Sequence, residues 1–146
     1  MTVPCIIIDV DGTVADNEHR AHLIQSDPPD WGTFSAPDRV ILDAPIAPMI
    51  DLVRTLRQDA IVIALTGRQR ALYHTTWEWF RQHRVAVAYL VMRPDNDYRP
   101  APEFKLEAVR DLWDRGWRPT LFIDDHQATL DVIAPEFPSV QCLRKM

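Results

Sequence analysis

Acidic side chains stand in two closely spaced pairs in this sequence. Asp9 and Asp11 belong to the run 9–13 (DVDGT), and Asp124 is followed directly by Asp125. Each pair comes after a short apolar run that is rich in β-branched residues, as expected of a buried strand. Four carboxylates at one place repel one another, so a cation must accompany them. Oxygen ligands of this kind suit Mg²⁺, which commonly binds through one or two carboxylates and a substrate phosphate.

A hydroxyl, a glycine turn and a basic residue complete a set that can transfer a phosphoryl group. Thr66, Gly67 and Arg68 follow another apolar run, and Lys105 stands near the start of an expected helix. A carboxylate at a strand end can attack phosphorus and form an acyl phosphate, while a second one two residues on moves protons. The Thr66 hydroxyl, the Gly67 amide and Lys105 are suited to hold the transferring group.

The elements that would position these residues alternate along the chain. Five apolar runs predict strands buried on both faces, at 5–8, 61–65, 85–92, 120–123 and 140–143. Amphipathic patterns predict helices at 46–56, 70–83 and 103–115, with a weaker one at 129–134 before Pro135. The alternation indicates an α/β fold with a parallel sheet. In such a sheet, ligands bind beyond the carboxyl ends of the strands, where the polar residues stand.

The segment 14–45 interrupts this alternation. It is polar, rich in Asp and Pro, and contains no clear strand, so we expect short helices that form a small cap over the end of the sheet. Trp31 and Phe34 in this segment are expected to pack the cap onto the core, with stacking on a base as the alternative. No linker divides the chain, and we expect residues 1–146 to form a single domain.

The four motifs, in this order, resemble those of the haloacid dehalogenase (HAD) superfamily. The resemblance runs over essentially the whole chain and implies an α/β, Rossmann-like three-layer sandwich with a central five-stranded parallel sheet. It places the first strand in the middle, the second and third on one side, and the fourth and fifth on the other. It also implies a Mg²⁺-dependent phosphatase.

The resemblance assigns roles to the motif residues. Asp9 is the expected nucleophile and a metal ligand, and Asp11 is the expected acid and base, which also gives the metal its main-chain carbonyl. Asp124 is expected to bind the metal directly and Asp125 through water. The residues expected to contact the phosphoryl group or the rest of the substrate are Thr66, Lys105, Gly12, Thr13, Gly67, Arg68, Arg93 and Arg99.

Residues 92–99 (MRPDNDYR), followed by Phe104 and Lys105, give a closer resemblance. They are similar to the phosphatase domain of bacteriophage-type polynucleotide kinase/3′-phosphatases. Arg93 and Arg99 are then candidates for a substrate phosphate, or else form ion pairs with neighbouring aspartates. Arg68 has the same two alternatives. The chain has no kinase phosphate-binding loop, so we expect no kinase activity.

Composition narrows the function further. The net charge of −5 and the pI of about 5.4 argue against a non-specific nucleic-acid binder. There is no apolar run long enough to span a bilayer and no signal-peptide pattern, so we expect a cytoplasmic protein with no membrane and no obligate protein partner. Cys5 and Cys142 are expected to be reduced packing residues.

These observations favour hydrolysis of a phosphomonoester, with a 3′-phosphate end of nucleic acid as the preferred substrate. A 5′(3′)-nucleotidase or a small-metabolite phosphatase is the alternative, because the acidic charge favours a smaller substrate. A non-catalytic module that binds phosphate or nucleic acid is the rival outside the enzymes. The intact carboxylates and Lys105 argue against that rival, since a binding module needs no nucleophile.

Overall fold

A five-stranded parallel sheet forms the centre of the protein in this computed structural model, which describes all residues 1–146. Its strands are β1 (Val3–Ile8), β4 (Ile61–Gln69), β5 (Tyr89–Arg93), β6 (Trp117–Asp124) and β7 (Gln141–Arg144). They lie in the order β5-β4-β1-β6-β7, and every neighbouring pair is parallel. The predicted α/β class and the predicted strand order are both confirmed.

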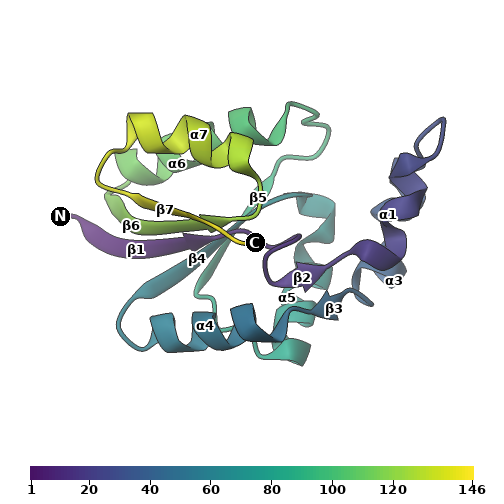
Figure 1. Ribbon diagram of the computed structural model, residues 1–146, viewed down its shortest axis with the longest axis horizontal. Coiled ribbons are helices and arrows are strands. Elements are labelled where there is room, and N and C mark those ends of the chain that lie inside the picture. The colour runs from purple at the N-terminus through teal and green to yellow at the C-terminus, as the bar shows by residue number, and fades with distance from the viewer.

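Helices cover both faces of the sheet (Figure 1). On one face lie α4 (Ala47–Arg57) and α5 (Tyr73–His83), which follows a short 3₁₀ turn at Arg70–Leu72. On the other face lie α6 (Ala101–Asp114) and α7 (Gln127–Glu136). Parallel strands need long crossover connections, and these four helices provide them. The result is the expected three-layer sandwich.

The central strand β1 divides its side chains between two apolar cores. Ile6 and Ile8 join the core beneath α4 and α5, whereas Cys5 and Ile7 join the core beneath α6 and α7. All four are buried, because successive side chains of a strand point to opposite faces and both faces are covered. This is why the sequence of β1 is a continuous apolar run.

The segment 14–45 contains three short helices: α1 (Glu18–Gln25), α2 (Trp31–Phe34) and α3 (Pro37–Val40). It also contains two strands, β2 (Ala15–Asp16) and β3 (Ala44–Pro45), which pair antiparallel where the segment leaves and rejoins the core. The expectation of no strand here was therefore wrong, because two-residue strands leave no periodic pattern. Figure 1 shows the cap beside the end of the sheet where β2 and β3 lie. That it is an insertion within a single domain stays a prediction.

Three other details differ from the sequence-based expectations. Strand β5 begins at Tyr89, four residues later than expected, because α5 ends in the left-handed residue Arg84 (φ 55°) and the following apolar residues form a loop. Helix α7 continues through Pro135 and ends at Glu136, although proline lacks the N–H for one helical hydrogen bond. Trp31 does not pack onto the core, since it is 59% exposed.

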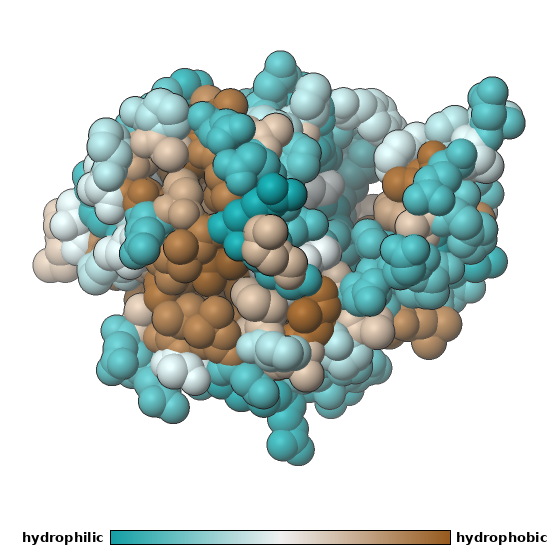
Figure 2. Space-filling model, viewed as in Figure 1, coloured by the Kyte–Doolittle hydropathy of each residue, from teal (hydrophilic) through white to brown (hydrophobic).

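The surface is mixed in character. Figure 2 shows apolar side chains gathered between β7 and α4, and the exposed Leu52 and Leu143 belong to these two elements. Hydrophilic residues cover most of the cap in the same view. None of the helices combines the length and the apolar character that crossing a bilayer requires.

Gly116, which ends α6 before β6, provides a test of the fold. Its φ is +98°, and a Cβ there would lie 2.8 Å from the main-chain oxygen of Met1. We expect Gly116→Ala to lower the free energy of unfolding by about 1–2 kcal/mol in urea denaturation. Gly32→Ala is the control, because Gly32 has no positive φ and a Cβ there would lie at an ordinary contact distance, 3.8 Å from Asp30 Oδ1. Equal midpoints for the two variants would show that the turn does not require glycine.

Candidate active site

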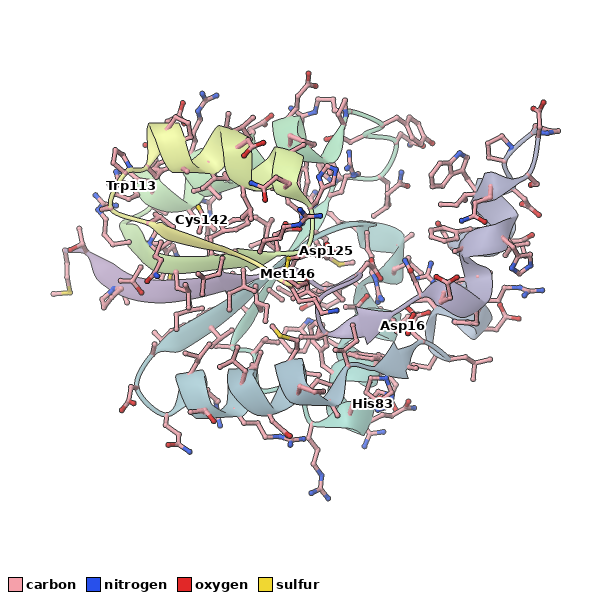
Figure 3. The ribbon with its side chains drawn as sticks, in the orientation of Figure 1. Asp16, His83, Trp113, Asp125, Cys142 and Met146 are labelled. Atoms are coloured by element: carbon pink, nitrogen blue, oxygen red, sulfur yellow. The ribbon has the colours of Figure 1, made fainter.

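The carboxyl ends of β1, β4 and β6 bring the predicted motifs to one place. Asp9 follows β1, Thr66 lies within β4, and Asp124 ends β6. Carboxylate oxygens of Asp9, Asp124 and Asp125 all lie within 4.8 Å of one another. Figure 3 shows Asp125 at the end of the sheet that faces the cap. The expected convergence of the motifs at this edge is what the structure shows.

Lys105 lies between two of these carboxylates. Its Nζ is 2.7 Å from Asp9 Oδ1 and 2.7 Å from Asp124 Oδ2, and the side chain is buried. Burial acts to lower the pKa of Lys105, but the negative charges of Asp9 and Asp124 outweigh it and raise the pKa. Lys105 is therefore a charged ammonium group at neutral pH.

One ammonium group does not balance three carboxylates. Burial raises the pKa of Asp9 well above its ordinary value, and the charge of Asp124 adds to this, while Lys105 acts in the opposite direction. The pKa of Asp125 is also raised, first by burial. Ionisation of the whole set thus needs a further positive charge. The donors are all carboxylate oxygens, so these residues fit Mg²⁺.

The turn after β1 orients the expected nucleophile. Thr13 donates a hydrogen bond from its Oγ1 to Asp9 Oδ2, at 3.0 Å. Gly12 has a φ of +80°, and a Cβ on it would lie 2.0 Å from Asp125 Oδ2. Only glycine therefore suits this position, because any side chain would displace Asp125. The contacts of Gly12 and Thr13 with substrate stay predictions.

Thr66 and Gly67 lie within β4, which continues to Gln69, so the expected end of this strand at residue 65 before a glycine turn was wrong. Thr66 is fully buried, and its Oγ1 accepts a hydrogen bond from the main-chain N–H of Arg68, at 3.1 Å. The main-chain oxygen of Gly67 accepts one from Arg93 Nε, at 3.0 Å. These bonds fix the backbone near the carboxyl end of β4. The binding of a phosphoryl group by Thr66 and Gly67 remains a prediction.

Arg68 belongs to a buried cluster of charges that joins the core to the cap. Its Nη2 lies 2.9 Å from Asp11 Oδ1 and 3.0 Å from Asp43 Oδ2, and its Nη1 donates to Thr76. Arg20 of α1 donates to both oxygens of Asp43 at 2.8 Å and to Asp11 at 3.3 Å. Of the two interpretations of Arg68, the structure shows the aspartate pair, and its contact with substrate stays a prediction.

This cluster gives Asp11 an environment opposite to that of Asp9. Burial acts to raise the pKa of Asp11, but the charges and hydrogen bonds of Arg68, together with Arg20, outweigh it and lower the pKa. Asp11 is therefore ionised. Its carboxylate lies with the arginines and not in the group formed by Asp9 and its neighbours. Metal binding by the main-chain carbonyl of Asp11, which the resemblance implies, stays a prediction.

Sequence reasoning missed Arg20 and Asp43. Both side chains are buried, and Arg20 also stacks on the ring of Phe34, 4.4 Å from its centre. They come from the polar segment 14–45, in which an arginine and an aspartate are ordinary residues. No periodic pattern marks them, so the sequence offers no signal that could have found them.

Arg93 and Arg99 are both engaged by other residues of this chain. Arg93 is buried, lies over the ring of Phe104, and donates to the main-chain oxygens of Asp97 and Arg99. Arg99 pairs with Asp97 at 2.7 Å. Arg93 Nη1 also lies 3.6 Å from Asp97 Oδ1, so the ion-pair alternative is present in the structure for both arginines. Contact of either arginine with a substrate phosphate stays a prediction.

Comparison with known families gives one clear match. The family model described as the polynucleotide kinase PNKP phosphatase domain matches residues 3–135. These residues include all four motifs and the cap. No curated protein sequence matches the chain.

Solved structures share the fold. A "Pnkp1/Rnl/Hen1 complex" contains a chain that is 23% identical, with a TM-score of 0.79, over 99% of this chain and 46% of the other. A "Pnkp1/Rnl/Hen1 RNA repair complex" contains a chain that is 22% identical, with a TM-score of 0.79, over 99% of this chain and 42% of the other. This chain thus spans less than half the length of these relatives, and identities this low establish similarity of fold alone.

The charge cluster provides a stability test. Asp43→Asn removes the negative charge that pairs with both Arg20 and Arg68. Because two buried arginines then lose an ion-pair partner, we expect the free energy of unfolding to fall by about 2–4 kcal/mol. The control is Asp51→Asn, which breaks an exposed pair with Arg54 and should change it by less than about 0.5 kcal/mol. Urea denaturation compares the two. Similar small effects would mean that the cluster contributes little to the packing of the cap.

Proposed function

The chain belongs to the family of the polynucleotide kinase PNKP phosphatase domain, and on that premise we propose that it hydrolyses phosphomonoesters through an acyl phosphate formed on Asp9. The observation that carries this proposal is the buried Lys105 between Asp9 and Asp124, with Asp125 beside them. A module that only binds ligands has no need of a buried nucleophile held this way.

In the first step, a carboxylate oxygen of Asp9 attacks phosphorus, and the bond from phosphorus to the leaving alkoxide breaks. Thr13 and Lys105 each hold one oxygen of Asp9, which fixes the direction of attack. Lys105 also offsets the charge of the transferring group. The leaving oxygen needs a proton, and Asp11 is ionised while Arg68 and Arg20 hold it. Asp11 therefore has to turn from Arg68 to the substrate and take up a proton from solvent, which it then gives to the leaving oxygen. Asp43 then keeps the arginines paired.

In the second step, water attacks phosphorus, and phosphate leaves with the carboxylate of Asp9 restored. Asp11 accepts the proton of this water. The form of Asp11 held by Arg68 and Arg20 is the ionised form that this step needs. The arginines therefore favour the form of Asp11 that acts as the base in this second step.

Mg²⁺ would be held by Asp9, Asp124 and Asp125 with the main-chain carbonyl of Asp11. When bound, it supplies the positive charge that lets an anionic carboxylate approach an anionic phosphate. The carboxylates of Asp9 and Asp124 already lie against Lys105. Asp125 contributes the third carboxylate, above Gly12.

We propose a 3′-phosphate end of nucleic acid as the substrate. The family match supports it, and so does the fold that this chain shares with part of an RNA repair complex. The cap is small, and part of the Asp11 side chain is exposed at the site, which suits the end of a polymer. A 5′(3′)-nucleotidase is the second candidate, favoured by the net charge of −5.

Replacing the nucleophile tests the mechanism. Asp9→Asn keeps the size of the side chain but removes the attacking charge, so we expect hydrolysis of an aryl phosphate to fall by about three orders of magnitude or more. Asp59→Asn, at an exposed turn, is the control and should retain full activity. Near-normal turnover by a folded Asp9→Asn would refute the role of Asp9.

Removing the metal tests the proposed site formed by Asp9, Asp124 and Asp125. We expect a chelator to abolish turnover and Mg²⁺ to restore it, while Ca²⁺ inhibits because it takes more ligands at longer distances. Mg²⁺ should also raise the melting temperature of the wild type. Asp124→Asn should lose most of this shift, which is a readout independent of activity. Activity in excess chelator would contradict a metal site.

A substrate panel tests the choice of substrate. It contains an oligonucleotide with a 3′-phosphate, the same oligonucleotide with a 5′-phosphate, a nucleoside 3′-monophosphate and a sugar phosphate. We expect the highest kcat/KM for the 3′-phosphorylated oligonucleotide. A preference for the mononucleotide would move the assignment to a nucleotidase. Failure with every substrate, in the presence of Mg²⁺, would favour the binding module.

A further inference from the structure

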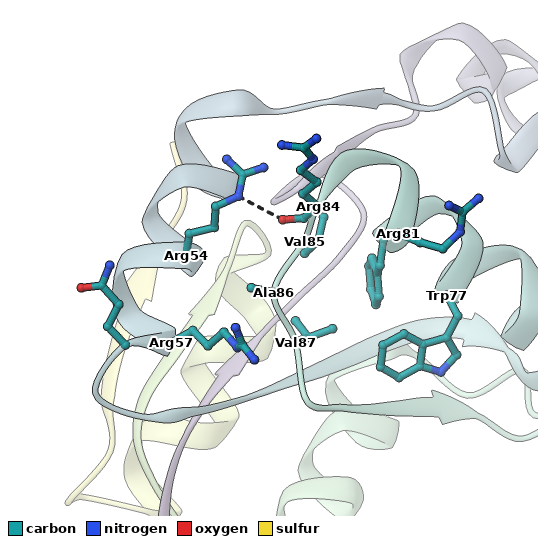
Figure 4. A pocket seen from close by; sticks show the side chains of 10 residues that line it. Arg54, Arg57, Trp77, Arg81, Arg84, Val85, Ala86 and Val87 are labelled. Carbon is teal, nitrogen blue, oxygen red and sulfur yellow. Dashed lines mark hydrogen bonds between the residues drawn. The ribbon is translucent and has the colours of Figure 1, made fainter.

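A hollow lies between the last turns of α4 and α5, apart from the active site (Figure 4). Its volume is about 650 Å³. Four arginines border it: Arg54 and Arg57 from α4, Arg81 from α5, and Arg84 from the residue that ends α5. This is a local concentration of positive charge on a chain whose net charge is −5.

The floor of the hollow is apolar. It consists of Val85, Ala86 and Val87, which form the loop before β5, with Trp77 and Phe80 at one side. Val85 and Phe80 are buried, whereas Ala86 and Val87 are partly exposed. The floor is thus made mainly of methyl groups, and the charges stand around it.

Two of the four arginines have no carboxylate partner within the chain. Arg54 pairs with Asp51 and donates to the main-chain oxygens of His83 and Arg84, and Arg81 pairs with Glu78. The guanidinium groups of Arg57 and Arg84 form no ion pair, and both residues are exposed. The hollow therefore presents two arginines that are free to bind an anion.

Arg84 occupies a backbone position where glycine would be the less strained residue. Its φ of 55° and ψ of 44° are left-handed, and glycine is the usual residue at such a helix end. A residue with a side chain is less stable than glycine in this conformation. The turn needs the conformation but not the arginine. The guanidinium that Figure 4 shows at the edge of the hollow is therefore not explained by the fold.

The hollow and the active site lie at opposite ends of the sheet. Helix α4 ends before the amino end of β4, and the loop 85–87 leads to the amino end of β5. The catalytic motifs follow the carboxyl ends. From Ile61 to Thr66, strand β4 alone covers about 16 Å. A ligand in the hollow would leave the active site open to substrate.

We propose that this hollow is a docking site for an acidic segment of a protein partner, with an apolar side chain between carboxylates. The arginines offer bidentate bonds to carboxylates, and the methyl groups of the floor accept the apolar side chain. The fit to single-stranded nucleic acid is poorer, because stacking needs an exposed aromatic face. Of the two aromatic residues at the hollow, Phe80 is buried and only Trp77 is partly exposed.

Fluorescence anisotropy with labelled peptides tests this site. The probe is a nonapeptide of glutamates around a central leucine, and its partner probe replaces every glutamate by glutamine. We expect the acidic peptide to bind the wild type, and we expect this binding to weaken with added salt. The glutamine peptide should bind at least about tenfold less tightly than the acidic one. The double variant Arg57→Ala/Arg84→Gly should lose about tenfold in affinity for the acidic peptide.

Matched variants distinguish binding at the hollow from general electrostatic attraction to the protein. Arg110→Ala/Arg115→Ala removes the same charge from exposed positions on α6 and its end, and should bind as the wild type does. Arg84→Gly relieves the left-handed strain, so the double variant should fold normally and hydrolyse an aryl phosphate at the wild-type rate. Equal binding of the acidic peptide by wild type and double variant would overturn the proposal.

Two other results would assign the hollow to a different occupant. One is tighter binding of an unphosphorylated single-stranded oligonucleotide than of the acidic peptide, lost in the double variant, which would indicate nucleic acid. The other is self-association of the wild type in analytical ultracentrifugation that the double variant lacks, which would indicate a second copy of this chain. Either result would overturn the assignment to an acidic partner segment.

Discussion

Lys105 lies with its ammonium group 2.7 Å from carboxylate oxygens of both Asp9 and Asp124. All three side chains are buried, and isolated charges at such depth would be very costly. The sheet order makes this contact possible, because β1 and β6 are neighbours and their carboxyl ends carry the two aspartates. Helix α6 brings Lys105 over the same edge. The fold therefore concentrates negative charge here and neutralises only part of it, which leaves a place suited to a divalent cation and a phosphate.

A second set of charges separates the tasks of Asp9 and Asp11. Burial raises the pKa of Asp9, whereas Arg68 and Arg20 overcome burial and lower the pKa of Asp11. Two carboxylates only two residues apart thus have opposite tendencies. Asp9 needs a further positive charge before it can attack as an anion, and Asp11 has to leave the arginines before it can carry a proton. Because Arg20 comes from the cap and Arg68 from the core, Asp11 is held by residues of both parts. Asp43 binds both arginines and keeps them in place.

The parts of this structure that could be predicted from sequence are those with a local pattern. Continuous apolar runs indicated the buried strands, and the polar residues after them indicated the edge at which Asp9, Lys105 and Asp124 meet. The parts that could not be predicted depend on contacts between distant residues. Arg20 and Asp43 lie in a polar segment without periodicity, and only folding shows that they are buried together. The late start of β5 has a similar cause, since the turn at the end of α5 decides it.

The proposed mechanism depends on a covalent bond between phosphorus and Asp9, which reductive trapping would detect. Borohydride added during turnover of an aryl phosphate converts an aspartyl phosphate to homoserine, which peptide mass spectrometry locates in the chain. We expect homoserine at position 9 only, and only when substrate and Mg²⁺ are both present. Homoserine at Asp11, Asp124 or Asp125 instead, or sustained hydrolysis with none of the four modified, would refute the covalent role of Asp9.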